Sequence, residues 1–596
     1  MTQRSKHSES GEGTVAAPSR RAFIRAASTI AASSVALGTL SKASAAPVEP
    51  DANRDSEEAD GDTRASSDLD RSLRRTQRRV RIEAAQQNFE LPIAAQKANG
   101  DEERYPNQIG SDTRGLPHNQ LGEVDPAAWK AAIAALDARS WELLEGITLG
   151  GTRKLVNPIG TLAASLEGEN VSQVLIPPAP AIASDARAAE AVEQYWQALL
   201  RDVSYSELEQ NDDAHAAAAE LSKLPGYAGP RDESGAVTAR ILFRGSVRYS
   251  DPSDASGRTP KHVIPPGVLD GPTISQFAFR DIAYGTQRIA AVSRVPVKGQ
   301  DFLIDYDEWL ANQDGEAATR TIEYEATPRY LSTVRDLNEY AHGGNPLFWG
   351  AALQLAAADG GSATAPAGVG APVSPTNPYL ASKTQASANA SFGLGYLQAL
   401  LSVGASRAVR AAYWAKWFVH RSVRPEAYGG LVHNFLEEKA DYPIPEALLR
   451  SQALAKAASK FGTHLIPHAY PEGAPLHGSY PAGSAAVAGV SATLIKAYFD
   501  ERYVIPNAVV VDPADPTKLL PFTGGELTVG GEVNKLALNY TFGRVTSGIH
   551  WRSDSAAGLA LGEQIAISIL RDERLTFVEP FEGFTFTRFD GTKITI

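Results

Sequence analysis

Apolar residues recur at helical spacing along most of the chain. The segment 125–146, DPAAWKAAIAALDARSWELLEG, begins with an aspartate N-cap and a proline in the first turn, and its apolar positions then return every three or four residues. The same periodicity is found in the segments SDARAAEAVEQYWQALLRDV, ASRAVRAAYWAKWFVHRSV, IPEALLRSQALAKAASKFG, GSAAVAGVSATLIKAYFD and DSAAGLALGEQIAISILRDE. The pattern predicts a helix in each of these segments.

Strand patterns are short. Apolar and polar residues alternate in RILFRGSVRYS and in the C-terminal GFTFTRFDGTKITI, where Asp590–Gly591 predicts a hairpin turn. The Gly-, Ala- and Pro-rich segment 356–379 predicts a long loop between helices. We therefore expect a mainly α fold, with one large helical-bundle domain and small β-hairpin additions.

The N-terminal segment has the features of an export signal. Arg20 and Arg21 precede a mildly apolar stretch, residues 26–40, and a small-residue cleavage site, Ala-Ser-Ala, ends at Ala45. This arrangement resembles a twin-arginine signal. We expect residues 1–45 to be the signal peptide of a periplasmic or secreted protein. The alternative is a disordered basic tail.

A linker is predicted at residues 46–78. Its first part, residues 48–70, is acidic and nearly free of large apolar residues, which predicts disorder. The basic segment RSLRRTQRRVRIEAAQQNFE that follows fits either a first helix or a solvated arm. No second linker of similar quality follows, so we expect residues 79–596 to form a single helical domain.

Composition narrows the possible functions. The formal net charge is −12, from 57 basic and 69 acidic residues, so nucleic acid and anionic membrane surfaces are poor partners. No apolar run after the N-terminal segment is long enough for a membrane span. The chain has no Cys and one Met, which excludes disulfides, thiolate ligands and a cysteine nucleophile. This scarcity of oxidisable side chains suits contact with strong oxidants, and it equally fits a general bias in amino acid usage.

The first of three segments that could build an anion site contains Lys416, His420 and Arg424. In KWFVHRSVRPEAYGG the lysine and the arginine are eight positions apart, which on a helix places both on nearly one face, with the histidine midway. Pro425 is then expected to end the helix. Taken alone, such a pair of cations is usually only a solvated helix face.

The other two segments add a helix N-terminus and a second pair of side chains. Gly483 follows a Pro-Ala turn at the start of a long apolar helix, whose first N–H groups could face a ligand. Arg544 and His550 lie six positions apart on a predicted loop before another apolar helix, where Asp554 fits an N-cap or a partner of the histidine. Each feature alone would more often be an ordinary helix start or a structural histidine. Together with the first segment they supply what a phosphate-like trianion needs.

These segments resemble, in order and spacing, the vanadium-dependent haloperoxidases and the related acid phosphatases. The similarity extends towards the algal and cyanobacterial bromoperoxidase branch and spans residues 115–572. It is visible in GLPHNQLGEVDPAAW, RKLVNPIGTLAASLEGEN, SQFAFRDIAYG, DFLIDYDEWL, WFVHRSVRPEAYGG and HAYPEGAPLHGSYPAG. The resemblance implies the helical-bundle fold of that family and an enzyme that depends on vanadate.

The resemblance also implies roles for the site residues. His550 would be the protein ligand of vanadium, and Lys416, Arg424, Arg544 and the N–H of Gly483 would hold the vanadate oxygens. Lys416 would also polarise peroxide, and vanadium would act as a Lewis acid that needs no thiol or haem. The expected reaction is oxidation of a halide, bromide above all, by hydrogen peroxide to hypohalous acid, with an organic substrate as a further candidate partner.

Two positions depart from the family's usual Pro-Ser-Gly-His turn. Ala482 lacks a hydroxyl for one vanadate oxygen, and a hydrogen bond to a charged acceptor contributes about 1.5–3 kcal/mol, so oxyanion affinity should fall without vanishing. Ser484 can hydrogen-bond an oxygen but cannot act as an acid or base near neutral pH. This weighs more against phosphatase activity, which requires a protonated leaving group, than against haloperoxidase activity.

Two histidines are candidates to move protons in place of Ser484. His477 matches the extra histidine of the bromoperoxidase branch, and His420 lies on the cationic face; both could instead fill structural hydrogen bonds. We therefore take Lys416, Ser484, His477 and His550 as the catalytic candidates.

A rival interpretation is a family member without redox turnover. Its oxyanion pocket would bind phosphate and serve a phosphatase or a non-redox enzyme acting on an organic substrate. A purely structural protein would require the cations and His550 to coincide by chance. The resemblance further implies a homodimer or larger homo-oligomer and a structural divalent cation, whose ligands the sequence does not identify.

Overall fold

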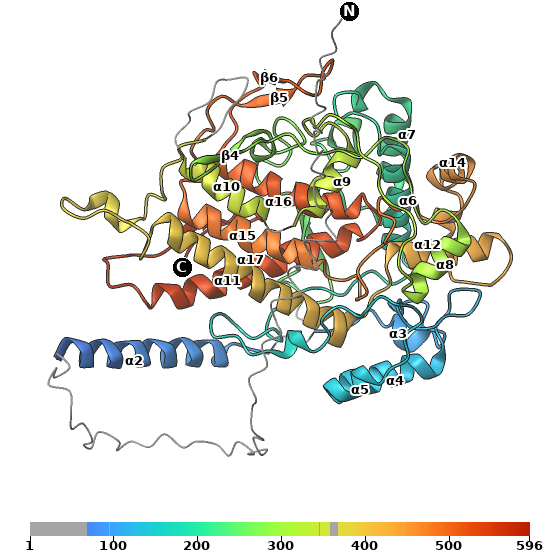
Figure 1. The fold of residues 1–596 in the computed structure, drawn as a ribbon, viewed down its shortest axis with the longest axis horizontal. Helices are drawn as coiled ribbons and strands as arrows, with labels where there is room; N and C mark the ends of the chain where they lie inside the picture. The colour runs from blue at the N-terminus through green and yellow to red at the C-terminus, as the bar shows by residue number, and fades with distance from the viewer. Residues whose placement is uncertain (1–67, 94–95, 255, 345, 358–367) are drawn as a thin grey trace, which may run out of the picture. The chain divides into compact units, whose positions relative to one another are not determined.

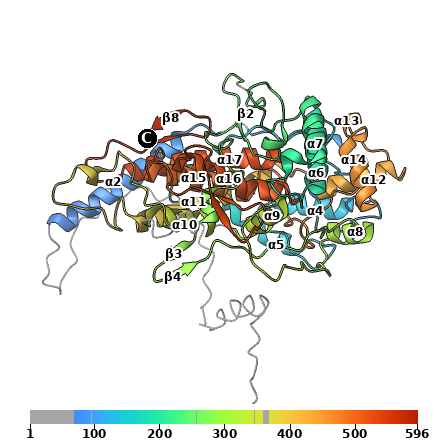
Figure 2. The same cartoon turned by 90° about the horizontal axis from the view of Figure 1, so that it is seen from above.

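A bundle of long helices forms the core of the fold. The computed structural model describes residues 68–93, 96–254, 256–344, 346–357 and 368–596, and residues 71–596 form one compact unit. Figure 1 and Figure 2 both show the bundle helices side by side. They are α10 (Pro346–Ala356), α11 (Leu394–Trp414), α15 (Gly483–Tyr498), α16 (Val529–Val545) and α17 (Arg552–Arg574).

Small residues allow α15 and α17 to pack closely. A β-carbon at Gly489 of α15 would overlap the carbonyl group of Leu559, and one at Gly562 of α17 would overlap the carbonyl oxygen of Ala486. Nearly every residue of α15 is buried, as expected for a helix that is apolar on all sides. This contact holds the N-terminus of α15 beside that of α17, where the candidate site lies.

A second apolar cluster is centred on α6 and helices that follow it in the sequence. Its helices are α6 (Asp185–Leu199), α7 (Asp212–Lys223), α12 (Pro425–Leu436), α13 (Glu446–Leu449) and α14 (Gln452–Phe461). The other α-helices of the described residues are α2 (Asp68–Glu90), α3 (Asp101–Arg104), α4 (Pro126–Asp137), α5 (Trp141–Glu145), α8 (Tyr306–Asp314) and α9 (Val334–His342).

The strands named in the described part of the chain form only two-stranded antiparallel sheets. The pairs are β1 (Val247–Ser250) with β2 (Pro260–Val263), β3 (Ile282–Tyr284) with β4 (Gln287–Ile289), β5 (Val509–Val511) with β6 (Leu519–Pro521), and β7 (Thr585–Thr587) with β8 (Lys593–Thr595). The β7–β8 hairpin turns at the predicted Asp-Gly pair. The prediction of a mainly α fold with small β-hairpins is confirmed.

Three of the predicted helices are interrupted, and the break in the third, after α11, lies in the candidate site. Asp125 caps α4 as expected, since its side chain accepts from the Ala128 N–H at 2.8 Å. The single predicted helix is nevertheless divided into α4 and α5. The division lies at Arg139, which adopts a left-handed backbone with φ 51°. The segment IPEALLRSQALAKAASKFG likewise divides into α13 and α14, where Ser451 caps the second helix by accepting from Ala453 N–H at 3.0 Å. Local hydrogen bonds and one turn residue override the apolar period.

The predicted signal peptide and residues 46–67 of the linker lie outside the described residues. The prediction of disorder up to residue 78 is wrong for residues 68–78, because α2 begins at Asp68. The basic segment is therefore a helix, the first of its two alternatives. Residues 368–377 are non-helical, as predicted for the long loop, but Ala356 is the last residue of α10, and Pro378 and Tyr379 begin a short 3₁₀-helix, Pro378–Ala381. In the described part of the chain, no helix combines the length and apolar character required to cross a bilayer.

Candidate active site

Lys416 and Arg424 do not share one helix face, contrary to the prediction from their spacing. α11 ends before a π-helical turn, Ala415–His420, and Arg421 then adopts a left-handed backbone with φ 38°. Arg424 is the N-cap residue of α12, which begins at Pro425. Both side chains are fully buried. The break in the helix, rather than its periodicity, brings them to the same interior region.

Both cations bond to backbone carbonyl groups of two separate segments. Lys416 Nζ donates to the carbonyl oxygens of Gly478 at 2.7 Å and Ser479 at 2.6 Å. Arg424 Nη1 donates to the carbonyl oxygen of Ile549 at 2.8 Å. The two side chains thus reach the segment before α15 and the segment before α17.

The cations are electrostatically unfavourable where they lie. Burial lowers the pKa of Lys416 well below its usual value, and Arg424 lowers it further. Burial and the neighbouring Arg114 also lower the pKa of Arg424 to about 10. The carboxylates of Asp112, Glu426 and Asp554 offset part of this cost, because they raise the pKa of one or both cations, and a bound anion would offset more. The cluster therefore favours a bound anion.

A cavity of about 210 Å³ lies where the predicted segments meet. Its walls include His477, Gly483, Ser484, Arg544 and His550. Arg544 projects from the last turn of α16, not from the predicted loop. The structure therefore gathers residues of the second and third predicted segments around one space. Lys416 and Arg424 of the first segment are not among the described residues that line it, but Arg424 contacts the lining residues His477 and His550.

Asp554 holds His550 in one tautomer. His550 Nδ1 lies 3.0 Å from Asp554 Oδ2, so the Nδ1 proton is donated to the carboxylate and Nε2 keeps a lone pair. Burial lowers the pKa of His550 well below its usual value, and Arg424 and Lys416 lower it further. Arg424 Nη1 lies 3.3 Å from Nε2. A neutral imidazole backed by a carboxylate is the arrangement expected of a metal-binding histidine.

Asp554 also joins the starts of the two central helices. Its Oδ2 accepts from the Ser479 hydroxyl and from the Trp551 N–H at 2.9 Å. Its backbone carbonyl accepts from the Ala482 N–H at 2.9 Å. Asp554 is the histidine's partner, one of the two roles predicted for it, and the N-cap residue of α17 is Trp551.

Comparison with known proteins identifies the family. A family model described as the VCPO second helical-bundle domain matches residues 397–576. A vanadium-dependent bromoperoxidase from Corallina pilulifera is 29% identical over 593 residues, which cover 87% of this chain and 97% of the relative. Another from Ascophyllum nodosum is 31% identical over 505 residues, covering 81% of this chain and 86% of the relative. The chain belongs to the vanadium-dependent haloperoxidases.

A solved structure supports the same assignment. The homohexameric second vanadate-dependent bromoperoxidase from Ascophyllum nodosum matches with a TM-score of 0.78 and 25% identity, covering 90% of this chain and 94% of that chain. The haloperoxidase helical-bundle fold implied by the resemblance is confirmed.

The residues of this haloperoxidase cavity fit a vanadate-like oxyanion. The Ser484 hydroxyl lines the cavity and is buried, yet it has no hydrogen-bond partner among the described residues. An unpaired buried hydroxyl costs free energy that an oxyanion oxygen would relieve. His550 offers a nitrogen ligand and Arg544 a positive charge to the same space.

Of the adjacent predicted cofactor-binding residues Ala482 and Gly483, only Gly483 lines the cavity. Ala482 is fully buried and is the N-cap residue of α15, but it is not among the described residues that line the cavity. Its methyl group packs in the core, and the sequence analysis expected this side chain to offer vanadate no hydrogen bond. Gly483 does line the cavity, and a β-carbon there would lie only 3.1 Å from the Tyr413 ring.

The two candidate proton carriers are also distinguished. Arg424 Nη2 lies 2.9 Å from His477 Nδ1. The carbonyl oxygen of Gly478 lies 3.0 Å from the same nitrogen, so Nδ1 can either accept from Arg424 or donate to Gly478. His420 packs edge-on against Tyr480 with ring centroids 4.8 Å apart, and it is not among the described residues that line the cavity. His477 is therefore the better-placed histidine.

Tyr413 was missed by the sequence analysis. It lines the cavity, and its ring centroid lies 4.8 Å from that of His477. It stands three positions before Lys416, near the end of α11, but no motif marks a single tyrosine there. Only the packing of α11 against α15 reveals its place.

Proposed function

We propose that the protein uses vanadate to oxidise bromide with hydrogen peroxide. The observation that supports this proposal is the single cavity shared by Arg544, a neutral His550 backed by a carboxylate, and the unpaired hydroxyl of Ser484. The choice of bromide follows the relatives, which are named as bromoperoxidases.

The buried groups have distinct tasks in this scheme. His550 would bind vanadium through Nε2, while Lys416, Arg424 and Arg544 offset the charge of the oxyanion. Vanadate would supply a Lewis acid that activates peroxide without thiol or haem. The anion in turn favours the ammonium form of Lys416, which burial and Arg424 disfavour in its absence.

Proton movement falls to His477 in this scheme. Burial, Lys416 and Arg424 lower the pKa of His477 well below its usual value, so its ring is neutral. A neutral imidazole in the cavity wall would act first as a base that accepts the proton of peroxide, and the resulting imidazolium would then return that proton to a departing oxygen. Ser484 only holds an oxygen by a hydrogen bond.

The test is halide oxidation by the purified apoprotein with and without orthovanadate. We expect bromination of a small dione indicator to require peroxide, bromide and vanadate together, and phosphate to compete with vanadate. Hydrolysis of 4-nitrophenyl phosphate is measured in parallel. Phosphatase activity without vanadate-dependent bromination would contradict the proposal and favour the rival phosphate pocket.

We also propose that the protein is exported by the twin-arginine route and cleaved after Ala45. The motif around Arg20 and Arg21 supports this proposal. N-terminal sequencing of the protein from the periplasm or medium is expected to begin at Ala46. Replacement of both arginines by lysine is the matched control and should block export; an uncleaved cytoplasmic wild type would contradict the idea.

A homo-oligomer is proposed because the solved relative is a homohexamer. Light scattering of the purified protein is expected to give a multiple of the subunit mass, which is 63.4 kDa before the signal peptide is removed. A monomer at micromolar concentration would contradict this proposal.

The structural divalent cation is proposed to bind at His433, Glu437 and His464, whose ligand atoms lie within 4.8 Å of one another. Two imidazoles and one carboxylate suit zinc better than calcium. Calorimetry with zinc is expected to show one site in the wild type and none in His464→Ala. Equal binding by both proteins would exclude this location.

A further inference from the structure

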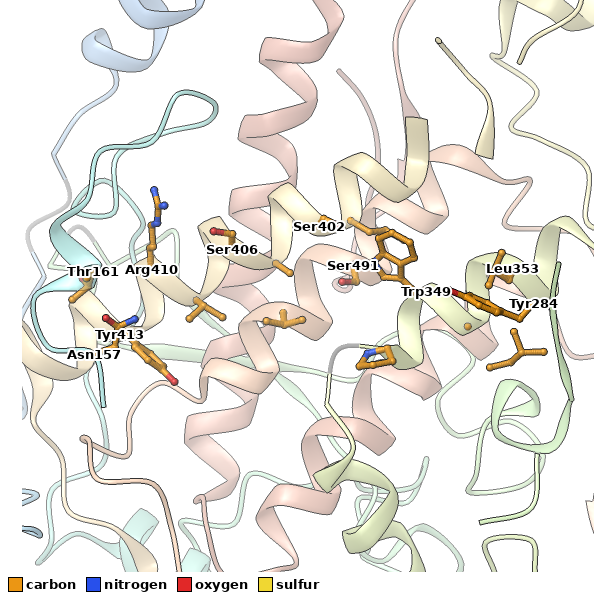
Figure 3. A pocket seen from close by; sticks show the side chains of 18 of the residues that line it. Asn157, Thr161, Tyr284, Trp349, Leu353, Ser402, Ser406, Arg410, Tyr413 and Ser491 are labelled. Atoms are coloured by element: carbon orange, nitrogen blue, oxygen red, sulfur yellow. The ribbon is translucent and has the colours of Figure 1, made fainter. Parts of the chain in front are cut away.

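A second hollow adjoins the catalytic cavity. It has a volume of about 880 Å³ and is lined by residues of α10, α11, α15 and the β3–β4 hairpin (Figure 3). We call it the groove. Val409, Tyr413 and Val487 line both the groove and the 210 Å³ catalytic cavity. The two spaces therefore share a wall at these side chains.

The end of the groove away from Tyr413 is apolar and open. Figure 3 shows Trp349, Leu353 and Tyr284 at that end. Trp349 is 36% exposed and Tyr284 is 59% exposed. Large apolar side chains that remain exposed in a concavity are typical of a binding site for an apolar partner.

The end nearest Tyr413 is polar. Figure 3 places Asn157, Thr161 and Arg410 there. Arg410 is held by donating from Nη1 to the Ala164 carbonyl oxygen at 3.0 Å. No carboxylate is found among the described residues that line the groove. This end is suited to a hydrogen-bond acceptor or a partly negative oxygen, and it repels no anion.

The groove has the size of a small-molecule site rather than of a protein interface. Its volume lies within the range of about 300–1,000 Å³ that binds organic ligands. Its polar end adjoins the wall of the catalytic cavity, so a ligand bound there would lie next to the place where the oxidised halogen is produced.

We propose that the groove binds the organic substrate of halogenation, a phenol with an apolar extension. The phenol oxygen would lie at Asn157 and Arg410, and the extension would run towards Leu353 and Trp349. An electron-rich ring is required because hypobromous acid is an electrophile. This proposal rests on the proposed haloperoxidase function and adds the class of substrate to it.

The chemical step balances without a further reagent. A ring carbon gives an electron pair to the bromine of hypobromous acid, so that a C–Br bond forms and the Br–O bond breaks. The ring proton leaves and combines with hydroxide as water. Peroxide is the oxidant that raises bromide to this level, so phenol, peroxide, bromide and one proton yield bromophenol and two waters.

Ser406→Phe tests the groove without disturbing the core. Ser406 is an exposed residue of α11 in the middle of the groove (Figure 3), so a phenyl ring there would block the path of the extension. Ser459→Phe is the matched control, because Ser459 is an exposed serine of α14 and is not among the described groove residues.

The first measurement is binding of 4-hexylphenol to the apoprotein without vanadate, followed by tryptophan fluorescence. We expect saturable binding by the wild type and by Ser459→Phe, and affinity weakened about ten-fold or more by Ser406→Phe. The second is the ratio of kcat/KM for bromination of 4-hexylphenol to that of phenol. We expect this ratio to fall about five-fold or more in Ser406→Phe only, since phenol has no extension to block.

The outcomes separate the two proposals. Absence of saturable binding, or equal binding by Ser406→Phe and the control, would overturn the groove proposal whether or not bromide is oxidised. If Ser406→Phe changed the mass found by light scattering but left the affinity for 4-hexylphenol unaltered, the groove would be a subunit interface and not the substrate site. If Ser406→Phe weakened binding of 4-hexylphenol but the wild type showed no vanadate-dependent oxidation of bromide, the groove proposal would be supported and the haloperoxidase function refuted.

Discussion

Replacement of Asp554 by asparagine should weaken vanadate binding while leaving the cavity in place. His550 Nδ1, the Ser479 hydroxyl and the Trp551 N–H all point at Oδ2. An amide oxygen at that position can still accept from these donors. The variant therefore removes the negative charge that makes the imidazole a better ligand, and little of the geometry.

The expected magnitude follows from that single loss. Replacing the partner of a metal-binding histidine typically costs about 10- to 100-fold in metal affinity, or about 1.4–2.8 kcal/mol. Asp554 Oδ1 has no hydrogen-bond partner among the described residues. The new amide N–H₂ would be a buried donor without an acceptor there, which should cost about 1–3 kcal/mol of unfolding free energy in addition.

Calorimetric titration of the apoprotein with orthovanadate would give the dissociation constant, and thermal melting would give the change in stability. Glu563→Gln is the matched control. Glu563 is another buried carboxylate of α17, where it accepts from Tyr249, Arg588 and the Phe589 N–H. The control should melt at a lower temperature but bind vanadate as the wild type does. Wild-type affinity in Asp554→Asn, or equal weakening in the control, would refute this account of the histidine's basicity.

Further predictions concern catalysis and pH. His550→Ala should abolish vanadate binding by calorimetry, whereas Lys416→Ala should retain it and slow bromide oxidation about 100-fold. Ser484→Ala should slow the reaction about ten-fold or less, and His477→Ala should slow it about 100- to 10,000-fold. A larger loss of steady-state rate in Ser484→Ala than in His477→Ala would show that His477 does not carry the proton. Burial raises the pKa of Glu169 to about 7, so the folded state holds a proton that the unfolded state releases. Stability is therefore lost as pH rises through the range between the usual glutamate value and 7, by at most about 3 kcal/mol before screening of this part-exposed side chain. Melting curves should show this loss in the wild type and not in Glu169→Gln.

The helices could be predicted wherever one period continues without a break. The segment that became α15 shows this, since its apolar pattern ends where the helix does. The π-helical turn at Ala415–His420 could not be predicted, because its extra residue leaves no mark in the apolar pattern. The spacing of Lys416 and Arg424 therefore suggested a shared helix face that does not exist. Their proposed place at one anion site came from combining three segments and from the resemblance to a family, not from the spacing alone.

The contacts that make the site work are tertiary, which explains what the sequence left open. Asp554 was a candidate N-cap or partner of His550 from its place at the start of the predicted helix, but the bond from Ala482 N–H to its carbonyl depends on the packing of two helices. The bond from Arg424 to His477 likewise joins segments that only the fold brings together. No local pattern predicts either contact.

The position of Tyr413 connects the oxyanion cavity with the groove. Its ring is close to His477 on one side, and a β-carbon on Gly483 would press against it on another. The same side chain lines the groove near Arg410. A substitution of Tyr413 would therefore alter three things together: proton transfer by His477, access to the bound oxyanion, and binding of the organic substrate in the groove. Substitutions at exposed groove positions such as Ser406 can separate substrate binding from halide oxidation, and Tyr413 cannot.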